Sequence, residues 1–365
     1  MEYYNNELKA LKRSGRLRER KLYDSKLLDM ASNDYLGFAS DKSLMQKAFD
    51  NISQLPDHAP KASLLVNGYH PIHQTFEKAL CQANGFEAGV IVGSGFSANI
   101  AMIEALVRKG DTLFMDELYH ASGQLASKLV DGEVVVFKHN DERHLEELLK
   151  TSNSKRKIVA IEGIYSMDGD MAKKGLFTLA DKYDALLIID EAHSSGVIGK
   201  SLMGILDFYD LPVRKNYIKM GTLGKAYGSF GAYILATEHI IEYLINRAKP
   251  IVYATAPSLF DTALGWEALK KIQRQAESLS LEIKKRQDIV KEILDVDVEG
   301  LIVPIVIDDN RKVLAIQESL KEDGILVGAI RQPTVSKAII RLIARLDIAV
   351  DDLKRACYTI KKIKG

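Results

Sequence analysis

An aspartate and a histidine stand three residues apart at the end of an almost wholly apolar stretch. The stretch "ALLIIDEAHSSGVIGK" begins at Ala185, and its acidic box holds Asp190 and His193. In helicases such a box belongs to an ATP-hydrolysing site, which also needs an upstream phosphate loop of the form G-x-x-x-x-G-K followed by Ser or Thr. The glycine–lysine stretch of this chain, "MGTLGKAYGSFG", lacks that spacing and lies downstream. Nucleic-acid-dependent ATP hydrolysis is therefore the weaker hypothesis.

A lysine follows the aspartate at a distance that suits a different chemistry. Lys225 lies 35 residues after Asp190, in a glycine-flanked turn behind the strand-like run "YIKMG". Ligand sites of open α/β sheets form at the carboxyl ends of the strands, so we expect both side chains at one edge of the sheet. A lysine there can form an imine with a carbonyl compound. A buried carboxylate can keep the pyridine nitrogen of pyridoxal phosphate protonated, and His193 can reach the phenolic oxygen of that ring.

The phosphate of such a cofactor needs an anion site. The stretch "GSGFSAN", from Gly93 to Asn99, is a glycine-rich turn that leads into a helix, and a helix N-terminus offers free N–H groups to an anion. An ordinary turn between a strand and a helix has the same pattern. The turn therefore indicates a phosphate site only in combination with the aspartate and the lysine. His120, in "DELYHASG", could stack on the cofactor ring; taken alone, it is typical of a hydrogen-bonded structural histidine.

Short apolar runs alternate with helical patterns through the first two thirds of the chain. We expect helices between the strands, one of them capped by Asp141. Continuous apolar strands that alternate with helices predict an α/β domain with a mostly parallel sheet covered on both faces. The expected strands span residues 88–92, 112–116, 133–138, 157–163, 185–190, 217–221 and 231–237.

The pattern changes after about residue 258. One long helical stretch is followed by short strands and helices, which predicts a compact α+β unit. We expect an N-terminal segment over 1–45, a large cofactor-binding α/β domain over 46–255, and a C-terminal α+β domain over 256–365.

Composition and charge narrow the class of protein. The 365 residues include 50 Lys and Arg against 49 Asp and Glu, so the formal net charge is +1 and no global field favours a polyanion. We therefore expect no nucleic-acid partner, and we interpret the one basic cluster, residues 11–21, as the solvated face of an N-terminal helix.

The two cysteines, Cys81 and Cys357, are far apart and give neither a disulfide framework nor a metal motif. No metal site is expected. The chain shows neither a signal-peptide core nor an apolar run long enough to cross a bilayer. These features predict a cytoplasmic protein with no membrane partner.

From about residue 28 to its C-terminus the chain resembles the α-oxoamine synthases, which are pyridoxal-phosphate enzymes. The blocks that carry the resemblance occur in the family's order: "MASNDYLGFAS", "GSGFSANIAMIEAL", "MDELYHAS", "EGIYSMDGDMA", "IDEAHSSGVIG", "GTLGKAYGSFGAYI" and "AIRQPTV" before "IIRL". The resemblance implies the fold-type I transferase fold, like that of aspartate aminotransferase, with a large mostly parallel-sheet domain and a smaller α+β domain. It also implies a pyridoxal 5'-phosphate cofactor.

The resemblance assigns four catalytic positions. Lys225 matches the lysine that bonds to the cofactor and moves the α-proton of the substrate. Asp190 matches the partner of the pyridine nitrogen, His193 the donor to the ring oxygen, and His120 the histidine that stacks on the ring.

Further positions match groups around the cofactor and the substrate. In relatives, the threonine at the position of Thr255 reaches the phosphate from the other subunit, which implies a homodimer with shared active sites. The remaining cofactor positions are Gly95, Phe96, Ser166 and Thr222, and the positions that contact the amino-acid carboxylate are Asn33 and Arg341. An arginine can bind a carboxylate through two parallel hydrogen bonds.

Members of the family condense an amino acid with an acyl thioester and release carbon dioxide. The run "AIRQPTV", residues 329–335, is similar to that of the biotin-pathway members, which use L-alanine and a pimeloyl thioester of coenzyme A or of acyl carrier protein. The alternative is another member, a glycine C-acetyltransferase or an acyltransferase that uses serine or another amino acid. A transaminase of the same fold would also carry the Asp190–Lys225 pair.

Two stretches depart from the family pattern. Residues 57–73 replace a run rich in glycine and serine near the acyl entrance, and "LIARLDIAVDD" follows Arg341 where the family often has small residues and a histidine. The choice of acyl carrier and the surroundings of Arg341 are therefore open at this point.

Overall fold

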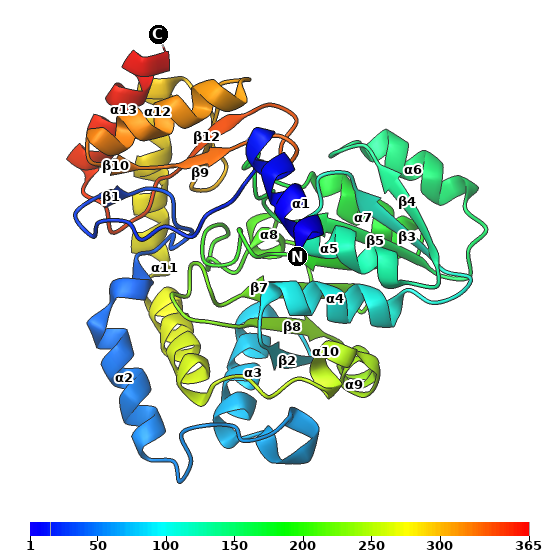
Figure 1. Cartoon of the computed structure of the whole chain (residues 1–365). Helices are drawn as coiled ribbons and strands as arrows, with labels where there is room; N and C mark the ends of the chain where they lie inside the picture. Colours follow the sequence, from blue (N-terminus) through cyan, green and yellow to red (C-terminus); the bar gives the residue numbers. More distant parts are fainter. Residues whose placement is uncertain (15, 365) are drawn as a thin grey trace.

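A seven-stranded sheet forms the centre of the larger part of the molecule (Figure 1). The structure, a computed structural model, describes residues 1–14 and 16–364. The strands lie in the order β2-β8-β7-β6-β5-β3-β4, and β8 runs antiparallel to both of its neighbours while the others are mutually parallel. The strands are β2 (Ala88–Val92), β3 (Thr112–Asp116), β4 (Glu133–Phe137), β5 (Lys157–Glu162), β6 (Leu186–Asp190), β7 (Tyr217–Thr222) and β8 (Ala232–Ala236). The expected α/β fold is confirmed, and each predicted strand end lies within one residue of the observed one.

The direction of β8 follows from the length of chain before it. Only residues 223–231 join β7 to β8, whereas a crossover to a parallel strand needs about a dozen residues or more. The chain therefore turns back directly, and the turn holds Lys225 at the carboxyl end of β7.

Helices cover both faces of this sheet, because alternate residues of each buried strand point to opposite sides. In β6, Ile189 packs in one core cluster and Ile188 in the other. The first face is covered by α3 (Pro71–Asn84), α6 (Glu142–Thr151), α7 (Lys174–Lys182) and part of α11 (Leu259–Leu294). The second face is covered by α4 (Gly95–Leu106), α5 (Ala121–Ala126), α9 (Glu238–Arg247) and α10 (Lys249–Val252).

The helix caps follow the sequence. The side chain of Asp141 accepts a hydrogen bond from the backbone N–H of His144 at 3.0 Å and caps α6, as predicted. Three short helical segments, η1 (Phe38–Ser40), η2 (Leu64–Gly68) and η3 (Ser127–Leu129), and the helices α2 (Lys42–Ser53) and α8 (Ile205–Phe208) complete this part of the chain.

The C-terminal part is built on a three-stranded antiparallel sheet in the order β11-β12-β9. The long helix α11 leads into it, and in Figure 1 the red and orange elements lie together beside the upper end of α11. A chain segment from near the N-terminus joins this part, because β1 (Leu28–Asp29) pairs in parallel with β10 (Ile325–Leu326). The other elements are β9 (Ile302–Val306), α12 (Asn310–Glu322), β11 (Gly328–Ile330), β12 (Ile339–Ile343) and α13 (Val350–Lys364). The boundaries 1–45, 46–255 and 256–365 remain a prediction.

One expectation for the N-terminus is only partly right. Helix α1 (Glu2–Arg13) carries no buried residue, as a solvated helix should, but it includes only the first three residues of the basic cluster over 11–21. Residues 16–21 are exposed or half-buried and not helical. The charge pattern was a weak indication of a helix over residues 16–21. A charge-rich stretch without an apolar stripe gains little from tertiary packing, which provides most helix stability in proteins.

Among the described residues, no helix is both long and apolar enough to cross a membrane.

Candidate active site

Polar side chains gather at the carboxyl edge of the large sheet. Asp190 ends β6, Glu162 ends β5 opposite it in register, and Thr222 ends β7. Asp190 and Glu162 are almost completely buried. The parallel strands bring these residues together from distant parts of the chain, as the rule for open α/β sheets predicts.

Lys225 lies in contact with His193, which lies in contact with Tyr35. The Lys225 Nζ is 2.7 Å from His193 Nε2, and the Tyr35 hydroxyl is 2.5 Å from His193 Nδ1. Burial lowers the pKa of Lys225 to about 8, and burial beside the lysine lowers the pKa of His193 well below its usual value. The lysine can therefore lose its proton near neutral pH and act as a nucleophile, while the histidine stays neutral.

Asp190 is held by hydrogen bonds to both of its oxygens. The Asn99 side chain donates to Oδ2 at 2.8 Å, and the Ala192 backbone N–H donates to Oδ1 at 2.9 Å. Asn99 is fixed in turn by the Tyr119 hydroxyl, which donates to its Oδ1 at 2.7 Å. This arrangement fixes a carboxylate at the strand end.

His120 joins the same network through Ser122. Its Nδ1 lies 2.7 Å from the Ser122 hydroxyl, and the side chain of Asn99 donates to that hydroxyl at 2.9 Å. Burial lowers the pKa of His120, and Lys225 lowers it further, against the opposing charge of Asp190. Hydrogen bonds thus link His120 to Asp190 through the side chains of Ser122 and Asn99.

Glu162 is a buried carboxyl group that the sequence analysis did not single out. Its Oε2 accepts the backbone N–H of Ser166 at 3.2 Å, while its Oε1 has no hydrogen-bond partner within the described chain. Burial, and next the charge of Asp190, raise the pKa of Glu162 well above its usual value. Two adjacent buried carboxyl groups resist double ionisation, so Glu162 binds a proton more readily than an exposed glutamate does.

The N-terminus of α4 lies beside Thr222. A Cβ built on Gly95 would lie 3.7 Å from the Thr222 Cβ. The Ser94 side chain and carbonyl accept the backbone N–H groups of Ser97 and Ala98, which leaves the first two helical amides, those of Gly95 and Phe96, as the open donors. Two open amides at the positive end of a 12-residue helix, next to a threonine hydroxyl, form a suitable place for a phosphate.

Arg341 reaches the site from the C-terminal sheet. Its Nε donates to the Ser166 carbonyl oxygen at 2.8 Å, and its Nη1 donates to Asn33 Oδ1 at 3.0 Å. The Tyr35 hydroxyl lies 3.3 Å from the same Asn33 oxygen. Asn33, Ser166 and Arg341 therefore form one cluster next to Lys225 and His193.

Thr255 is the one predicted site residue that stands apart. It is exposed and forms a bridge with Ser63 in the loop before η2. Within the described residues, no hydrogen bond joins Thr255 to the cluster around Lys225. Its predicted role concerns a second subunit and stays a prediction.

The cluster fits pyridoxal phosphate. The Glu162 Oε1 is buried and unpartnered, and the α4 amides of Gly95, which is half-buried, and Phe96, which is exposed, are free to donate. Polar groups without a protein partner at one site are what a polar ligand requires. Lys225 could bond to the carbonyl carbon, Asp190 could pair with the ring nitrogen, and the α4 N-terminus with Thr222 could hold the phosphate.

Sequence reasoning missed Tyr35, Asn99 and Glu162. Tyr35 and Asn99 both lie within blocks quoted above, "ASNDYLG" and "GSGFSAN". Asn99 lies about one turn into the helix that starts at Gly95. That place near the strand ends could have suggested Asn99 as a site residue. Glu162 could have been found as an acidic residue at the end of an apolar strand.

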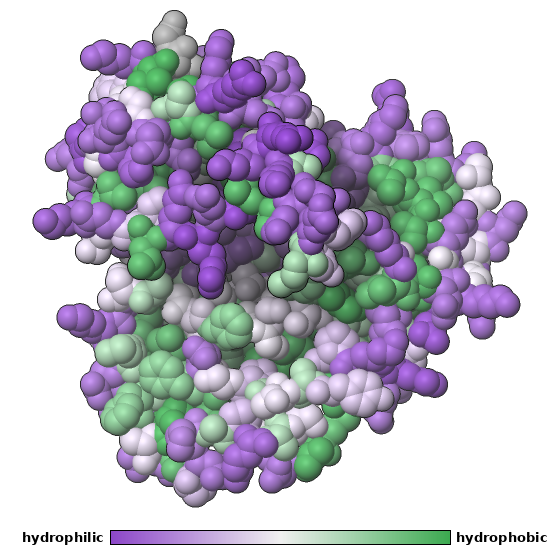
Figure 2. Space-filling model, in the orientation of Figure 1, coloured by the Kyte–Doolittle hydropathy of each residue, from purple (hydrophilic) through white to green (hydrophobic). Residues whose placement is uncertain are grey.

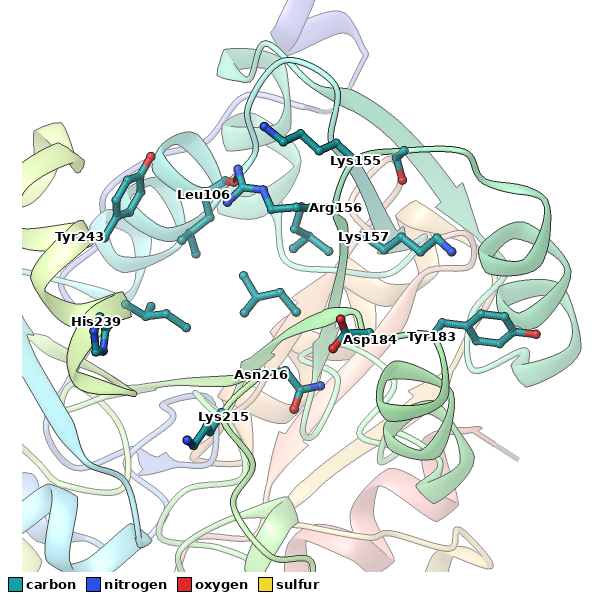
Figure 3. A pocket seen from close by; sticks show the side chains of 14 residues that line it. Leu106, Lys155, Arg156, Lys157, Tyr183, Asp184, Lys215, Asn216, His239 and Tyr243 are labelled. Atoms are coloured by element: carbon teal, nitrogen blue, oxygen red, sulfur yellow. Dashed lines mark hydrogen bonds between the residues drawn. The ribbon is translucent and has the colours of Figure 1, made fainter.

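The surface is hollowed in two places that matter here. Figure 2 shows a recess between the C-terminal part and the large-sheet part, on the side where α1 lies. A separate cavity of about 600 Å³ opens at the amino ends of β5 to β7, lined by Lys155, Arg156 and His239 among others (Figure 3). That cavity lies at the opposite edge of the sheet from Lys225 and Asp190, so it is distinct from the candidate active site.

Known proteins resemble this chain over nearly its whole length. The profile of the family described as aminotransferase class I and II matches residues 25–360. An 8-amino-7-oxononanoate synthase of Helicobacter pylori is 42% identical over 98% of this chain and 96% of its own length. One of Dechloromonas aromatica is 34% identical over 93% of each chain.

Solved structures agree with the fold. The crystal structure of an 8-amino-7-oxononanoate synthase from Francisella tularensis has a TM-score of 0.77 at 26% identity and covers 93% of this chain and 98% of its own. A serine palmitoyltransferase of Sphingomonas wittichii has a TM-score of 0.89 at 22% identity, covering 99% and 96%; at that identity it supports the fold alone. The chain therefore belongs to the class I and II aminotransferase family, within the α-oxoamine synthases, and is similar to their 8-amino-7-oxononanoate synthases.

Proposed function

We propose that the protein catalyses the decarboxylative condensation of L-alanine with a pimeloyl thioester in biotin biosynthesis, in the cytoplasm. The products are 8-amino-7-oxononanoate, carbon dioxide and the free thiol carrier, either coenzyme A or acyl carrier protein. The observation that carries the proposal is the meeting of Lys225, His193, Asp190 and Arg341 at one sheet edge, in a chain 42% identical to a relative of that name.

Pyridoxal phosphate, when bound, supplies a conjugated ring that accepts the electron pair of the substrate's α-carbon. The protein's part is to hold that ring and to move a proton. Asp190 would keep the ring nitrogen protonated, and His193 would donate to the ring oxygen. Lys225, whose pKa burial lowers to about 8, removes the α-proton of L-alanine and later returns one. Stacking by His120 fixes the ring and orients the thioester carbonyl.

Arg341 binds the carboxylate of L-alanine in this proposal. Asn33 and the Ser166 carbonyl oxygen hold the guanidinium at 3.0 and 2.8 Å. With Nε and Nη1 bonded to these partners, Nη2 is the nitrogen that would donate to a carboxylate in this proposal. A guanidinium prefers that planar geometry.

The substrate assignment can be tested with purified protein and pyridoxal phosphate. L-Alanine or glycine is offered with pimeloyl or acetyl thioesters, each on coenzyme A and on acyl carrier protein, and the amino-ketone is identified by mass. We expect 8-amino-7-oxononanoate as the main product. A faster reaction of glycine with the acetyl thioester would instead assign a glycine C-acetyltransferase, and amino-group exchange with a keto acid without any thioester would assign a transaminase.

The protein also acts as a homodimer in this proposal, with Thr255 of one subunit at the phosphate site of the other. Exposed apolar side chains support it. Leu65, Val66 and Tyr253 flank the Ser63–Thr255 bridge, Phe96 begins α4 and Phe230 lies in the Lys225 turn; these five are 48–80% exposed. Apolar groups that cluster on one surface commonly mark an interface, and closed two-fold dimers are the commonest assembly of soluble proteins.

Sedimentation analysis is expected to show a dimer, and Val66→Asp with Tyr253→Asp is expected to shift the protein toward monomer and to weaken cofactor binding. Two carboxylates placed in an apolar contact must be desolvated without a partner. Leu281→Asp, at another exposed apolar side chain, on α11, serves as the control and should leave the dimer intact. A wild-type monomer that is fully active would contradict the proposal.

A further inference from the structure

His139 lies between two carboxylates and contacts both. Its Nδ1 is 3.0 Å from Asp116 Oδ1, and its Nε2 is 2.8 Å from Asp170 Oδ2. A carboxylate accepts hydrogen bonds, and a neutral imidazole can donate only one. Two donated bonds require the doubly protonated, cationic ring. His139 therefore links the two acids as an imidazolium.

The two acids belong to two different loops of the candidate site. Asp116 ends β3 and begins the turn that leads to His120; its Oδ1 also accepts the Leu118 backbone N–H at 2.9 Å. Asp170 lies in the loop of residues 163–172, which carries Ser166. The Tyr165 backbone N–H donates to the Asp170 carbonyl at 2.9 Å, and Ile164 forms a bridge with Met171. His139 itself follows β4 and belongs to neither loop.

Asn140 reinforces the same link. Its backbone N–H donates to Asp116 Oδ2 at 3.0 Å, and its side chain donates to Asp170 Oδ2 at 2.8 Å and to the Met171 carbonyl at 3.0 Å. It adopts a left-handed conformation, with φ of 52°, which an asparagine tolerates better than most residues. The ring of Tyr165 meets the His139 ring edge-on at 4.4 Å between centroids.

The two acids are anchored to different degrees. Asp116 belongs to β3, a strand paired on both sides, and its side chain is completely buried. The side chain of Asp170 is 37% exposed and lies in a loop. If the imidazolium were removed, Asp116 would stay in place and the loop of residues 163–172 would lose a fixed point. The Ser166 carbonyl, which that loop carries, accepts the hydrogen bond that orients Arg341.

We propose that His139 is a positioning residue: as an imidazolium it clamps the loop of residues 163–172 to the end of β3, and it thereby holds Ser166 and Arg341 in place for the amino-acid carboxylate. This clamp, formed by Asp116, His139, Asn140 and Asp170, is distinct from the groups that contact the cofactor or the substrate. The part that concerns the carboxylate rests on the proposed function. The part that concerns the loop rests only on the geometry.

Kinetics test the first part. His139→Gln and Asp170→Asn are each expected to raise the KM for L-alanine by about tenfold, because Arg341 loses its fixed orientation, and to leave the KM for the thioester within about twofold. Their double variant should lose little more than either single one, since both remove the same contact. His239→Gln, at an exposed histidine beside the cavity of Figure 3, is the matched control and should behave as the wild type. Equal effects on both KM values, or additive losses in the double variant, would overturn the proposal.

Hydrogen exchange tests the second part on the protein without cofactor or substrate. Peptides that cover residues 163–172 are expected to exchange at least about tenfold faster in His139→Gln and in Asp170→Asn than in the wild type, while peptides of β5, β6 and β7 keep their rates. Unchanged exchange in both variants would refute the clamp, whatever the kinetics show. Faster exchange in the variants, with no selective rise in the KM for L-alanine, would support the clamp but refute its link to L-alanine binding. If His139→Gln failed to fold, exchange in Asp170→Asn, a change at a partly exposed side chain, would still test the clamp.

Because the clamp requires a charged His139, the stability that it contributes should depend on pH. The groups that face His139 are Asp116 from β3, Glu117, which accepts the His139 backbone N–H at 2.8 Å, Asp168 and Asp170 from the loop, and Tyr165. Hydrogen bonds to Asp116 and Asp170, against burial, raise the pKa of His139 to about 10. The clamp's stabilisation is complete below pH 6.5 and is lost as the pH rises through about 10. The difference in Tm between the wild type and His139→Gln should therefore vanish above pH 10; a difference that stays constant across that range would contradict the imidazolium.

Discussion

Replacement of Lys225 by alanine is expected to abolish turnover and the visible absorbance that pyridoxal phosphate gains when it bonds to a lysine. The side chain occupies the turn between β7 and β8, and its Nζ lies 2.7 Å from His193 Nε2. Burial lowers its pKa to about 8, so the free amine is available near neutral pH. In the proposed function this one amine both bonds to the cofactor and carries the proton. A misplaced or missing acid–base group alone costs roughly a hundred- to ten-thousandfold in rate.

The matched control for this variant is Lys215→Ala. Lys215 is exposed and lines the cavity at the opposite edge of the sheet (Figure 3), so its loss should leave both absorbance and rate unchanged. The experiment compares the spectrum of each protein after addition of pyridoxal phosphate and the rate of amino-ketone formation. A Lys225→Ala protein that kept both the absorbance and the turnover would falsify the assignment of this lysine.

Substitution of Asp190 by asparagine is expected to keep the cofactor bound but to lower the rate by roughly a hundred- to several-thousandfold. Asp190 is buried at the end of β6, where Asn99 and the Ala192 backbone hold its two oxygens. The amide has the same shape but no charge, so the ring nitrogen would lose the partner that keeps it protonated. Loss of one partner of a buried charge pair costs about 3–5 kcal/mol, which corresponds to that range of rates.

The same change has a structural cost that can be separated from the chemical one. Two donors face the Asp190 oxygens, whereas an amide offers only one oxygen, so one buried donor would lose its acceptor at a cost of about 1–3 kcal/mol. We expect a lower Tm for Asp190→Asn together with the lower rate. Asp184→Asn is the control, at an exposed aspartate whose left-handed backbone asparagine tolerates. Full activity in the Asp190 variant would remove the carboxylate from the mechanism.

The architecture of the large sheet, and the edge at which Asp190 and Lys225 lie, could be predicted from the amino-acid pattern. The seven predicted strands are confirmed within one residue at each end, because an apolar run bounded by turn residues is a local property of the chain. Asp190, His193 and Lys225 were correctly expected to lie together. Asp190 ends β6, and His193 and Lys225 each come three residues after a parallel strand. The carboxyl ends of such strands meet at one edge whatever the details of packing.

The contacts between the residues that the resemblance assigned to the substrate depend on the tertiary fold. Arg341 contacts Asn33 and Ser166, which lie 308 and 175 residues away along the chain, and no periodicity reports contacts of that range. The pairing of β1 with β10, which carries the N-terminal segment to the C-terminal sheet, was likewise invisible in the sequence. It places Asn33 beside Arg341.

Charge states also depended on the fold. Glu162 ends an apolar strand and His139 follows one, but their neighbours along the chain do not set the charge of either side chain. Burial beside Asp190 raises the pKa of Glu162, and two carboxylates from separate loops raise the pKa of His139. Desolvation and Coulomb interactions act through space over a few ångströms. Hydrophobic spacing can therefore locate a strand end, but the protonation of the groups gathered there follows only once the chain is folded.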